Sequence, residues 1–293
     1  MTGLYNVRAV FYYLAKRFLI RDSVCKGRQM ISSIRVLFEN ISGGLVMAGT
    51  SHDEMVFSRV SLKEYISYFK TQSPDILSLC EVHMEDEQGN SEMVDRISAE
   101  LNLPFYKCYS QSPSHLDTSK YMGLAVLSRY PIEEYSTFLL PNPKLRVLRP
   151  DGTQWVMFDK GAQKLTLRLE SSPLMVINLH YFPFHHFSHG IQEPQFSRVR
   201  RRLVNMLLKD TDIPTVITGD FNNKSQPLPS AFPELFENGH FLQAVVAETT
   251  VVGLSDEQFD HILYTPDTLS AQHGYAERNY SDHFAVIADF VFR

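Results

Sequence analysis

The sequence predicts the α/β class, with two stacked sheets covered by helices on their outer faces. Three observations support this prediction. Short runs of β-branched and aliphatic residues recur along most of the 293-residue chain, as expected of strands. Three segments between these runs instead carry apolar residues at helical spacing or a helix-start signal. The 20 Phe and 14 Tyr, within 44% hydrophobic residues, supply material for one large core.

Eleven segments are expected to be strands, because each is a short apolar run bounded by turn residues. They are residues 34–39, 75–82, 104–109, 122–128, 132–138, 164–169, 174–179, 214–218, 260–264, 268–275 and 284–291. Three helices are expected between them. Ser61 begins a capping-box pattern for a helix to about residue 70, Ser91 is expected to cap a helix reaching Leu101, and Pro194 begins the third.

Four stretches without a regular pattern carry most of the loop length and are expected to surround a functional site. They are residues 42–60, 110–121, 139–160 and 180–193. The polar motifs described below are spread from residue 40 to residue 283, so a division of the chain would split that site. One catalytic domain over residues 31–293, acting as a monomer, is therefore expected.

Residues 1–30 form a separate basic segment. Six Lys and Arg against one Asp give it a net charge of +5, so the remainder carries −10 of the total of −5. Apolar residues between Val7 and Phe18 recur at helical spacing, which predicts an amphipathic helix. We interpret it as a helix packed on the domain; an organelle-targeting helix and a membrane-surface anchor remain alternatives.

The three cysteines are odd in number and match no metal-ligand spacing. Cys80 lies inside an apolar strand run, where a thiol behaves as a small hydrophobe. These features indicate a reducing, cytoplasmic compartment rather than a secreted disulfide scaffold. Since the sequence has no apolar run of about 18 residues, a transmembrane helix is not expected.

Three polar motifs in the last third of the chain each adjoin an apolar run. Gly219-Asp220-Phe221-Asn222 follows residues 214–218, Asp260 opens a second run, and Ser281-Asp282-His283 precedes a third. A buried strand that stops at an acid delivers a carboxylate to the edge of a sheet. Several carboxylates beside a histidine can hold a hard cation and move protons. The set therefore predicts an enzyme.

This set resembles the endonuclease/exonuclease/phosphatase superfamily, which includes DNase I-like nucleases, neutral sphingomyelinases and inositol-polyphosphate 5-phosphatases. The upstream motifs of that family can be matched in order. A first strand ends at Asn40, a second carries Glu81, residues 123–132 resemble the central strand pair, and residues 176–180 resemble the family's Asn-Thr-His strand end. The resemblance covers residues 34–293 and implies a four-layer α/β/β/α sandwich of mainly antiparallel sheets. It also implies that the site lies where strand ends from both sheets meet.

The resemblance implies a site for Mg²⁺, or Mn²⁺ in its place, with Glu81, Asn40 and Asp282 at the metal. Asn40 would hold either a site carboxylate or a metal-bound water. Asp220 would orient or deprotonate the attacking water, and Asn222 would hydrogen-bond a phosphoryl oxygen. Carboxylate oxygens are the ligands that Mg²⁺ prefers.

Two histidines are expected to act on the substrate. Asp260 and His283 form a pair, because a carboxylate beside an imidazole fixes its tautomer and favours its protonated form. His180 would provide a second imidazole donor to the transition state, and Asn178 on the same strand is expected to contact the substrate.

An aromatic loop follows that strand. Phe184 and Phe187 are expected on the rim of the site, where they would stack on a base or touch an acyl chain. A loop packed on its own hydrophobic residues is the alternative.

The chain departs from the motifs of several subfamilies, and these differences limit the range of expected substrates. Abasic-site endonucleases usually show Trp-Asn and Gln-Glu where this chain has residues 39–40 and 80–81, and inositol 5-phosphatases show Asp-Arg where it has Asp260-His261. Residues 159–162 resemble a Lys-Gly strand entry of sphingomyelinases and related phosphodiesterases. The charge of −10 over residues 31–293 disfavours a grip on long nucleic acid.

The prediction is a metal-dependent phosphodiesterase or nuclease that acts on nucleotides or short nucleic acid. A sphingomyelinase-like or inositol-phosphate-type lipid phosphoesterase, acting on phospholipid, is the first alternative. A non-catalytic binding module on the same scaffold is the second.

Overall fold

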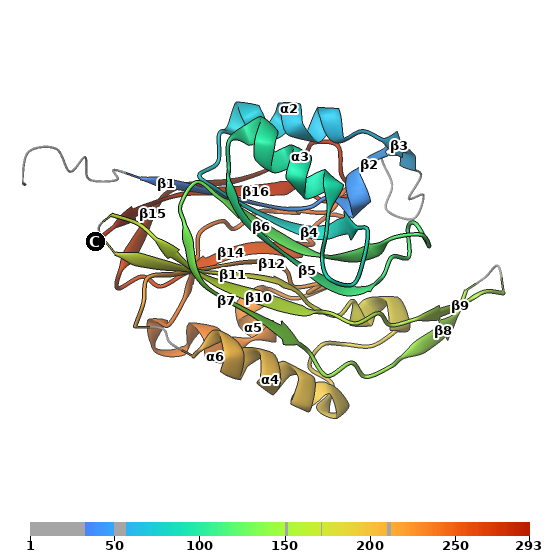
Figure 1. Cartoon of the computed structure of the whole chain (residues 1–293). Helices are drawn as coiled ribbons and strands as arrows, with labels where there is room; N and C mark the ends of the chain where they lie inside the picture. Colours follow the sequence, from blue (N-terminus) through green and yellow to red (C-terminus); the bar gives the residue numbers. More distant parts are fainter. Residues whose placement is uncertain (1–32, 50–56, 150–151, 171, 210–211) are drawn as a thin grey trace, which may run out of the picture. The chain divides into compact units, whose positions relative to one another are not determined.

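The computed structural model describes residues 33–49, 57–149, 152–170, 172–209 and 212–293 (Figure 1). The helix predicted within residues 1–30 lies outside these described residues. Within them, no helix is long and apolar enough to cross a membrane. Residues 32–293 form one compact unit that contains every polar motif named above.

The first sheet has six strands in the order β15-β16-β1-β4-β6-β5. β1 runs parallel to β4 and antiparallel to β16, and the other neighbours are antiparallel. Its strands are β1 (Ile34–Asn40), β4 (Ile76–Met84), β5 (Phe105–Pro113), β6 (Tyr121–Ser128), β15 (Leu269–Glu277) and β16 (Ala285–Phe292).

The second sheet also has six strands, in the order β13-β14-β12-β11-β10-β7. β11 runs parallel to β12, and the other neighbours are antiparallel. Its strands are β7 (Ile132–Leu139), β10 (Gly161–Arg168), β11 (Pro173–His180), β12 (Thr215–Asp220), β13 (Leu242–Gln243) and β14 (Asp260–Tyr264). Every residue of β12 and β14 is buried, which explains why these strands are continuous rather than alternating apolar runs.

The two sheets stack face to face, and helices cover their outer faces (Figure 1). α2 and α3 lie over the first sheet, whereas α4, α5 and α6 lie over the second, which confirms the predicted four-layer sandwich. The helices are α2 (Leu62–Gln72), α3 (Glu92–Leu101), α4 (Ser197–Leu207), α5 (Leu228–Ala231) and α6 (Pro233–Phe236). Short 3-10 turns are η1 (Ser42–Gly44), η2 (Phe184–Phe187), η3 (Pro194–Phe196) and η4 (Glu237–Gly239).

The helix-start signals have different outcomes. Ser91 caps α3 as predicted, since its hydroxyl accepts the amide of Val94 at 3.2 Å. Ser61 precedes α2 but makes no capping hydrogen bond through its side chain. Pro194 opens a 3-10 turn, and α4 itself begins three residues later at Ser197.

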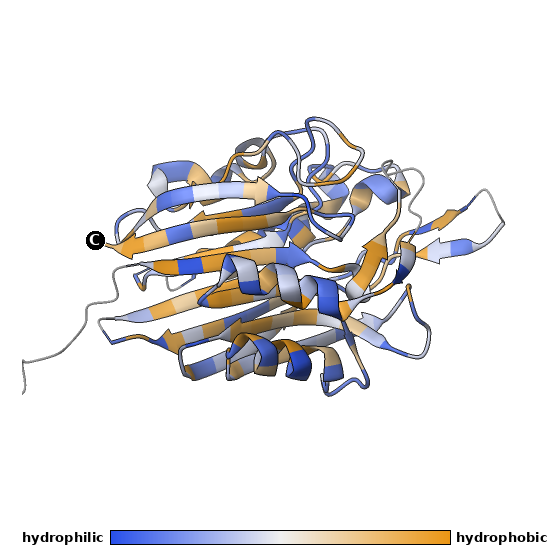
Figure 2. Ribbon diagram, turned by 90° about the horizontal axis from the view of Figure 1, so that it is seen from above, coloured by the Kyte–Doolittle hydropathy of each residue, from blue (hydrophilic) through white to orange (hydrophobic). Residues whose placement is uncertain are grey.

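Buried apolar side chains hold each helical layer to its sheet. Tyr65 and Phe69 of α2 pack with the strand residues of the first sheet, and Leu203 and Leu207 of α4 pack with those of the second. Seen from above, hydrophobic residues run along the strands while polar residues are interspersed on the helices (Figure 2). Burial of this kind stabilises by roughly 25 cal/mol per Å² of apolar surface.

Two of the four stretches expected to be irregular contain hairpins. β2 (Leu45–Met47) pairs with β3 (Phe57–Val60), and β8 (Arg146–Leu148) pairs with β9 (Gln154–Val156). Their strands are only three or four residues long, which is too short to show a clear alternation of apolar and polar residues in the sequence. The β8–β9 hairpin projects beyond the ends of the large sheets (Figure 1).

Candidate active site

Strand register brings the predicted polar residues to one end of the domain. In the second sheet His180 pairs with Asp220, and Asp220 pairs with Asp260, so three neighbouring strands place their polar ends side by side. In the first sheet Asn40 pairs with Cys80, next to Glu81. Because β14 is antiparallel to β12, its first residue meets the last residue of β12. The site is therefore built from the edges of both sheets.

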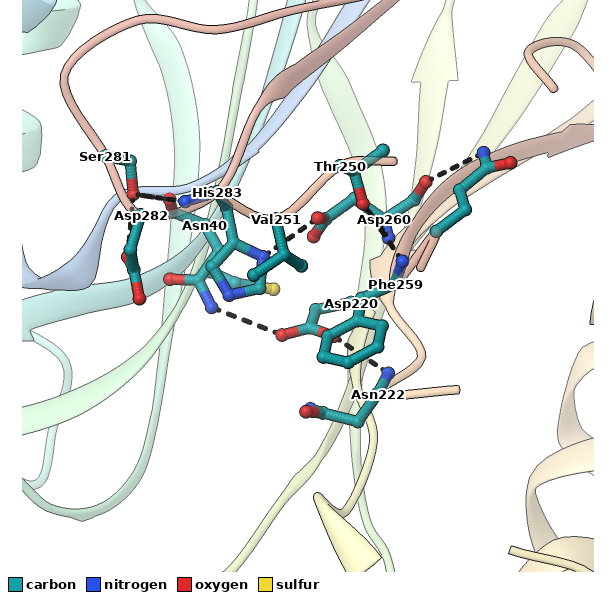
Figure 3. A network of polar contacts seen from close by, with 12 residues as sticks. Asn40, Asp220, Asn222, Thr250, Val251, Phe259, Asp260, Ser281, Asp282 and His283 are labelled. Atoms are coloured by element: carbon teal, nitrogen blue, oxygen red, sulfur yellow. Dashed lines mark hydrogen bonds and ion pairs between the residues drawn. The ribbon is translucent and has the colours of Figure 1, made fainter. Parts of the chain in front are cut away.

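Asp260 and His283 form a buried pair (Figure 3). His283 Nδ1 lies 2.8 Å from Asp260 Oδ2, and His283 is held by a backbone bridge to Val251. Burial alone would lower the pKa of His283, but Asp260 raises it well above its ordinary value. The imidazole is therefore positively charged at neutral pH, and its Nε2–H is a donor.

Asp220 accepts hydrogen bonds from two asparagines (Figure 3). The backbone N–H of Asn222 donates to Asp220 Oδ1 at 2.8 Å, and the side-chain Nδ2 of Asn40 donates to Asp220 Oδ2 at 3.2 Å. Burial, with the neighbouring charge of Asp260, raises the pKa of Asp220 to about 7. A carboxylate with a pKa near neutrality is suited to accept a proton from water.

Gly219 permits the close approach of β11 and β12 at this carboxylate. A Cβ at this position would lie 2.6 Å from both Leu179 Cγ and Leu179 O, which is too close for any ordinary contact. The glycine in the motif therefore keeps Asp220 in register with His180.

Asn40 and Asp282 are held by hydroxyl and amide donors. Asn40 Oδ1 accepts the amide of Ser42 at 3.2 Å, so both ends of its side chain are used. Asp282 Oδ1 accepts from the hydroxyls of Ser42 and Ser281, the latter at 3.1 Å. Asn40 therefore contacts the carboxylate of Asp220 directly, and its expected role at a metal stays a prediction.

Glu81 occupies a bulge in β4, where the register shifts between Cys80 and Val82. Its φ of 54° is in the left-handed region, which costs a non-glycine residue roughly 1–2 kcal/mol. Burial would raise the pKa of Glu81, but the positive charges of His115 and Lys160 lower it to about 2. The strained backbone thus presents an ionised carboxylate to the site.

Lys160 is a site residue that the motif analysis did not assign. It is buried, and its Nζ lies 3.0 Å from His180 Nδ1 and 3.1 Å from Nε2. Burial and this ammonium group together lower the pKa of His180 well below its ordinary value. His180 is therefore neutral, with Nε2 3.4 Å from Asp220 Oδ2. The available sequence signal was the lysine just before the glycine that begins β10.

Asn222 closes an Asx turn formed by Asp220 at the end of β12. Besides donating its backbone amide to Asp220, it donates from Nδ2 to the carbonyl of Tyr181 at 3.0 Å. One amide hydrogen remains on the side chain, which borders the pocket described below.

Two groups of acidic residues could hold a metal ion. Asp220, Asp260 and His283 have ligand atoms within 4.8 Å of one another. The hydrogen bond between His283 Nδ1 and Asp260 Oδ2 already brings two of these three residues together. Asp260 Oδ1 has no hydrogen-bond partner among the described residues, but the residue is completely buried.

Glu81 and Asp282 are the second candidate pair for a divalent cation. Both line the pocket, and Glu81 Oε1 lies 3.7 Å from Lys160 Nζ and 3.9 Å from His180 Nε2, farther than a hydrogen bond. Two carboxylates that border the same pocket match the preference of Mg²⁺ for oxygen ligands.

A pocket of about 290 Å³ connects these groups to the surface. Its inner part is lined by polar groups: Asn40, Glu81, Lys160, His180, Asp220, Asn222, Asp282 and His283. The rest of its lining is aromatic and apolar apart from Arg149. It comprises Phe57 of β3, Arg149, Trp155 and Val156 of the β8–β9 hairpin, and, from connecting segments, His115, Leu116, Met157, Phe158, Pro183, His186, Phe187 and Phe259. The expectation that long loops surround the site agrees with this lining.

Three residues expected to touch substrate have other roles. Asn178 is fully buried between the sheets, where Nδ2 donates to the carbonyls of Leu79 at 2.9 Å and Ala125 at 3.1 Å. Phe184 and Phe187 are only 2% and 6% exposed and belong to the core under the second sheet. The side-chain amide of Asn178 is already hydrogen-bonded, and the ring of Phe184 has almost no exposed surface. The expectations that Asn178 and Phe184 contact substrate were therefore wrong. Phe187 does line the pocket, but only through the small part of its ring that is exposed.

Comparison with known proteins places this geometry in context. A model of the Endonuclease/Exonuclease/phosphatase family matches residues 40–283. The chain is similar in structure to an endonuclease/exonuclease/phosphatase from Beutenbergia cavernae DSM 12333, with 17% identity and a TM-score of 0.67 over 89% of this chain and 72% of that one. It is also similar to the human Nocturnin catalytic domain with bound sulfate, with 17% identity and a TM-score of 0.59 over 89% and 95%.

A third similar structure is a mannosyl-6-phosphatase from Bacteroides thetaiotaomicron VPI-5482, with 14% identity and a TM-score of 0.57 over 88% of this chain and 100% of that one. No curated protein matches the chain by sequence. At these identities the structural likeness establishes the fold, and the substrate must be inferred from the pocket itself.

Proposed function

The chain belongs to the endonuclease/exonuclease/phosphatase family, whose members are phosphoesterases, and on this premise we propose that it is a phosphodiesterase dependent on Mg²⁺ or Mn²⁺. One observation carries the proposal. His180, Asp220 and Asp260 lie in register on neighbouring strands, and His283 from the other sheet completes the set through its 2.8 Å contact with Asp260. Proton acceptor, neutral donor and charged donor thus converge at one pocket.

Asp220 is proposed to take a proton from the attacking water. Its raised pKa makes it a stronger base than an ordinary carboxylate, and its two hydrogen bonds from Asn40 and Asn222 fix its orientation. These hydrogen bonds leave the carboxylate bordering the pocket where a water would enter.

The negative charge of the phosphoryl group is proposed to be stabilised by three donors. Charged His283 donates through Nε2, neutral His180 donates through a ring N–H, and Asn222 donates through its remaining amide hydrogen. Removal of one such donor typically slows an enzyme by about 10²–10³-fold. Lys160 adds a fixed positive charge beside His180.

Glu81 and Asp282 would hold the divalent cation. A cation there would neutralise charge on the phosphoryl oxygens. The two carboxylates enter the pocket from different segments of the first sheet's edge, β4 and the turn before β16.

Nucleotides or short oligonucleotides are the proposed substrates. The pocket of about 290 Å³ lies near the lower end of the range for small ligands, roughly 300–1,000 Å³. The charge of −10 over residues 31–293 opposes binding of long polyanions along the surface.

The test begins with the full-length protein and bis(4-nitrophenyl) phosphate in Mg²⁺ or Mn²⁺. Hydrolysis is expected, and EDTA should abolish it. Asp220→Ala and His283→Ala should each lower kcat by at least about 100-fold while the protein stays folded by circular dichroism. Full turnover after exhaustive chelation would overturn the metal dependence.

A binding module on the same scaffold predicts a different result. It would hydrolyse nothing in a broad screen of phosphomonoesters and phosphodiesters at several metal concentrations. It would also bind its ligand tightly whether or not metal is present. That combination would replace the enzyme proposal.

A further inference from the structure

We propose that the β8–β9 hairpin builds a subsite for the nucleobase of the substrate, with Arg149 and Trp155 as specificity-determining residues. This inference rests on the proposed hydrolysis of nucleotide phosphodiesters and adds the group that is recognised beside the phosphate. Both residues line the same pocket as Glu81 and Asp220, so the base would be joined to the scissile phosphate inside one cavity.

The hairpin holds a guanidinium group against an indole ring. Arg149 Cζ lies 4.2 Å from the centroid of Trp155, a cation–π contact that fixes the orientation of both side chains. Trp155 is braced from the loop after β11, with ring centroids 4.8 Å from His186 and 5.7 Å from Phe187. Trp155 is half-buried while Arg149 is exposed, so the pair is ordered and still accessible from the pocket.

Another pair of flat groups lines the same outer part of the pocket. His115 and Phe158 are stacked, with ring centroids 5.6 Å apart and planes inclined by 27°. Phe57 from β3 also lines this part and is half-buried. Planar π groups from separate segments of the chain therefore line this part of the pocket, together with the apolar Leu116, Val156, Met157 and Pro183.

A nucleobase fits this lining better than an acyl chain does. Bases stack on aromatic rings and on arginine guanidinium planes, and polar base edges can hydrogen-bond to imidazole and guanidinium groups. An acyl chain would instead desolvate the Arg149 guanidinium and the His115 imidazole without forming a hydrogen bond to either. The subsite consequently distinguishes nucleotides from lipids that carry the same kind of phosphodiester.

The first test uses Trp155 as its own probe, because it is the single tryptophan of the chain. Full-length protein in EDTA is titrated with adenosine 5′-monophosphate and, separately, with ribose 5-phosphate, and tryptophan fluorescence is recorded. The nucleotide should change the emission with saturation, whereas ribose 5-phosphate should not. Equal responses to both compounds would overturn the base subsite.

The second test compares two esters that share a leaving group. One is thymidine 5′-(4-nitrophenyl phosphate), and the other is methyl 4-nitrophenyl phosphate, which has no base. For Arg149→Ala and Trp155→Ala, the ratio of kcat/KM for the nucleoside ester to that for the methyl ester should fall about tenfold. Arg146→Ala, on the same hairpin but outside the pocket lining, should keep the wild-type ratio.

The outcomes separate this inference from the proposed function. Unchanged ratios in both pocket variants would overturn the subsite while hydrolysis itself stands. A saturable fluorescence change without hydrolysis of either ester would support the subsite and contradict the enzyme. Faster hydrolysis of sphingomyelin vesicles than of the nucleoside ester, with loss in Trp155→Ala, would assign the aromatic lining to a lipid and overturn the inference.

Discussion

His283 Nδ1 lies 2.8 Å from Asp260 Oδ2, and this contact joins the edges of the two large sheets. Asp260 begins β14 of the second sheet, whereas His283 precedes β16 of the first. Asn40 of β1 reaches Asp220 of β12 across the same boundary. The candidate site thus depends on the stacking of the two sheets, and any change that shifts one sheet against the other changes its geometry.

Replacing Asp260 by Asn should move the alkaline limb of the pH profile to lower pH. Asp260 is the main group that raises the pKa of His283 against the opposing effect of burial. The variant imidazole should lose its proton at a lower pH, and kcat/KM at pH 8 should fall by about 10²–10⁴-fold. The measurement is kcat/KM from pH 5 to pH 10, with Asp267→Asn, an exposed carboxyl elsewhere, as control.

The pair of His283 and Asp260 should also affect how the melting temperature depends on pH. A histidine whose folded pKa is raised contributes stability that is fully present below its unfolded pKa of about 6.5 and lost as pH rises through the folded value. The fall in melting temperature above pH 7 should therefore be smaller in Asp260→Asn than in the wild type. A parallel decline in both proteins would mean that the pair does not raise the pKa of His283.

Replacing Glu81 by Gln should weaken metal binding. The change removes an ionised carboxylate while keeping the side chain's size, and loss of such a ligand should raise the Kd for Mn²⁺ by at least about tenfold. Electron paramagnetic resonance titration of free Mn²⁺ measures this directly. Glu87→Gln, an exposed residue of the same region that accepts from Tyr121, is the matched control.

The metal titration also decides between the two acidic groups. If Glu81→Gln binds Mn²⁺ normally and Asp260→Asn does not, the cation belongs to Asp220, Asp260 and His283 instead.

Replacing Asn178 by Leu should destabilise the protein rather than remove a substrate contact. The variant leaves the buried carbonyls of Leu79 and Ala125 without their donor, and each unsatisfied group costs about 1–3 kcal/mol. Urea unfolding should show a lower free energy of unfolding, while KM at a temperature well below the transition stays close to wild type. A large rise in KM with unchanged stability would restore a role in binding.

Replacing Gly219 by Ala should lower activity through geometry. The new methyl group would meet Leu179 at 2.6 Å, forcing β11 and β12 apart where His180 and Asp220 are paired. Overpacking of this kind costs roughly 1–3 kcal/mol, and kcat should fall more than KM rises. Gly190→Ala, where the added Cβ would lie 3.8 Å from its nearest neighbour, Glu193 Oε1, is the control. Equal kcat in Gly219→Ala and wild type would show that the strand spacing tolerates the methyl group.

The sequence by itself determined the fold class and the positions of the polar strand ends. Strands such as β12 and β14 are short apolar runs that end or begin with an acid, and this pattern is local, so it can be read without knowing the partner strand. The order of the motifs then identified the family, and the family implied that Asp220, Asp260 and His283 meet.

Only the tertiary structure decided which other side chains reach the pocket. Arg149 and Trp155 lie in a stretch without strand periodicity, and their place in the pocket lining follows from the β8–β9 hairpin, whose strands have three residues each. Phe184 looks like a rim residue in the sequence yet is 2% exposed, because a 3-10 turn packs it into the core. Lys160 approaches His180 through the pairing of β10 with β11. Such placements, and the pKa shifts that follow from burial and neighbouring charge, depend on contacts between distant segments, which no local pattern records.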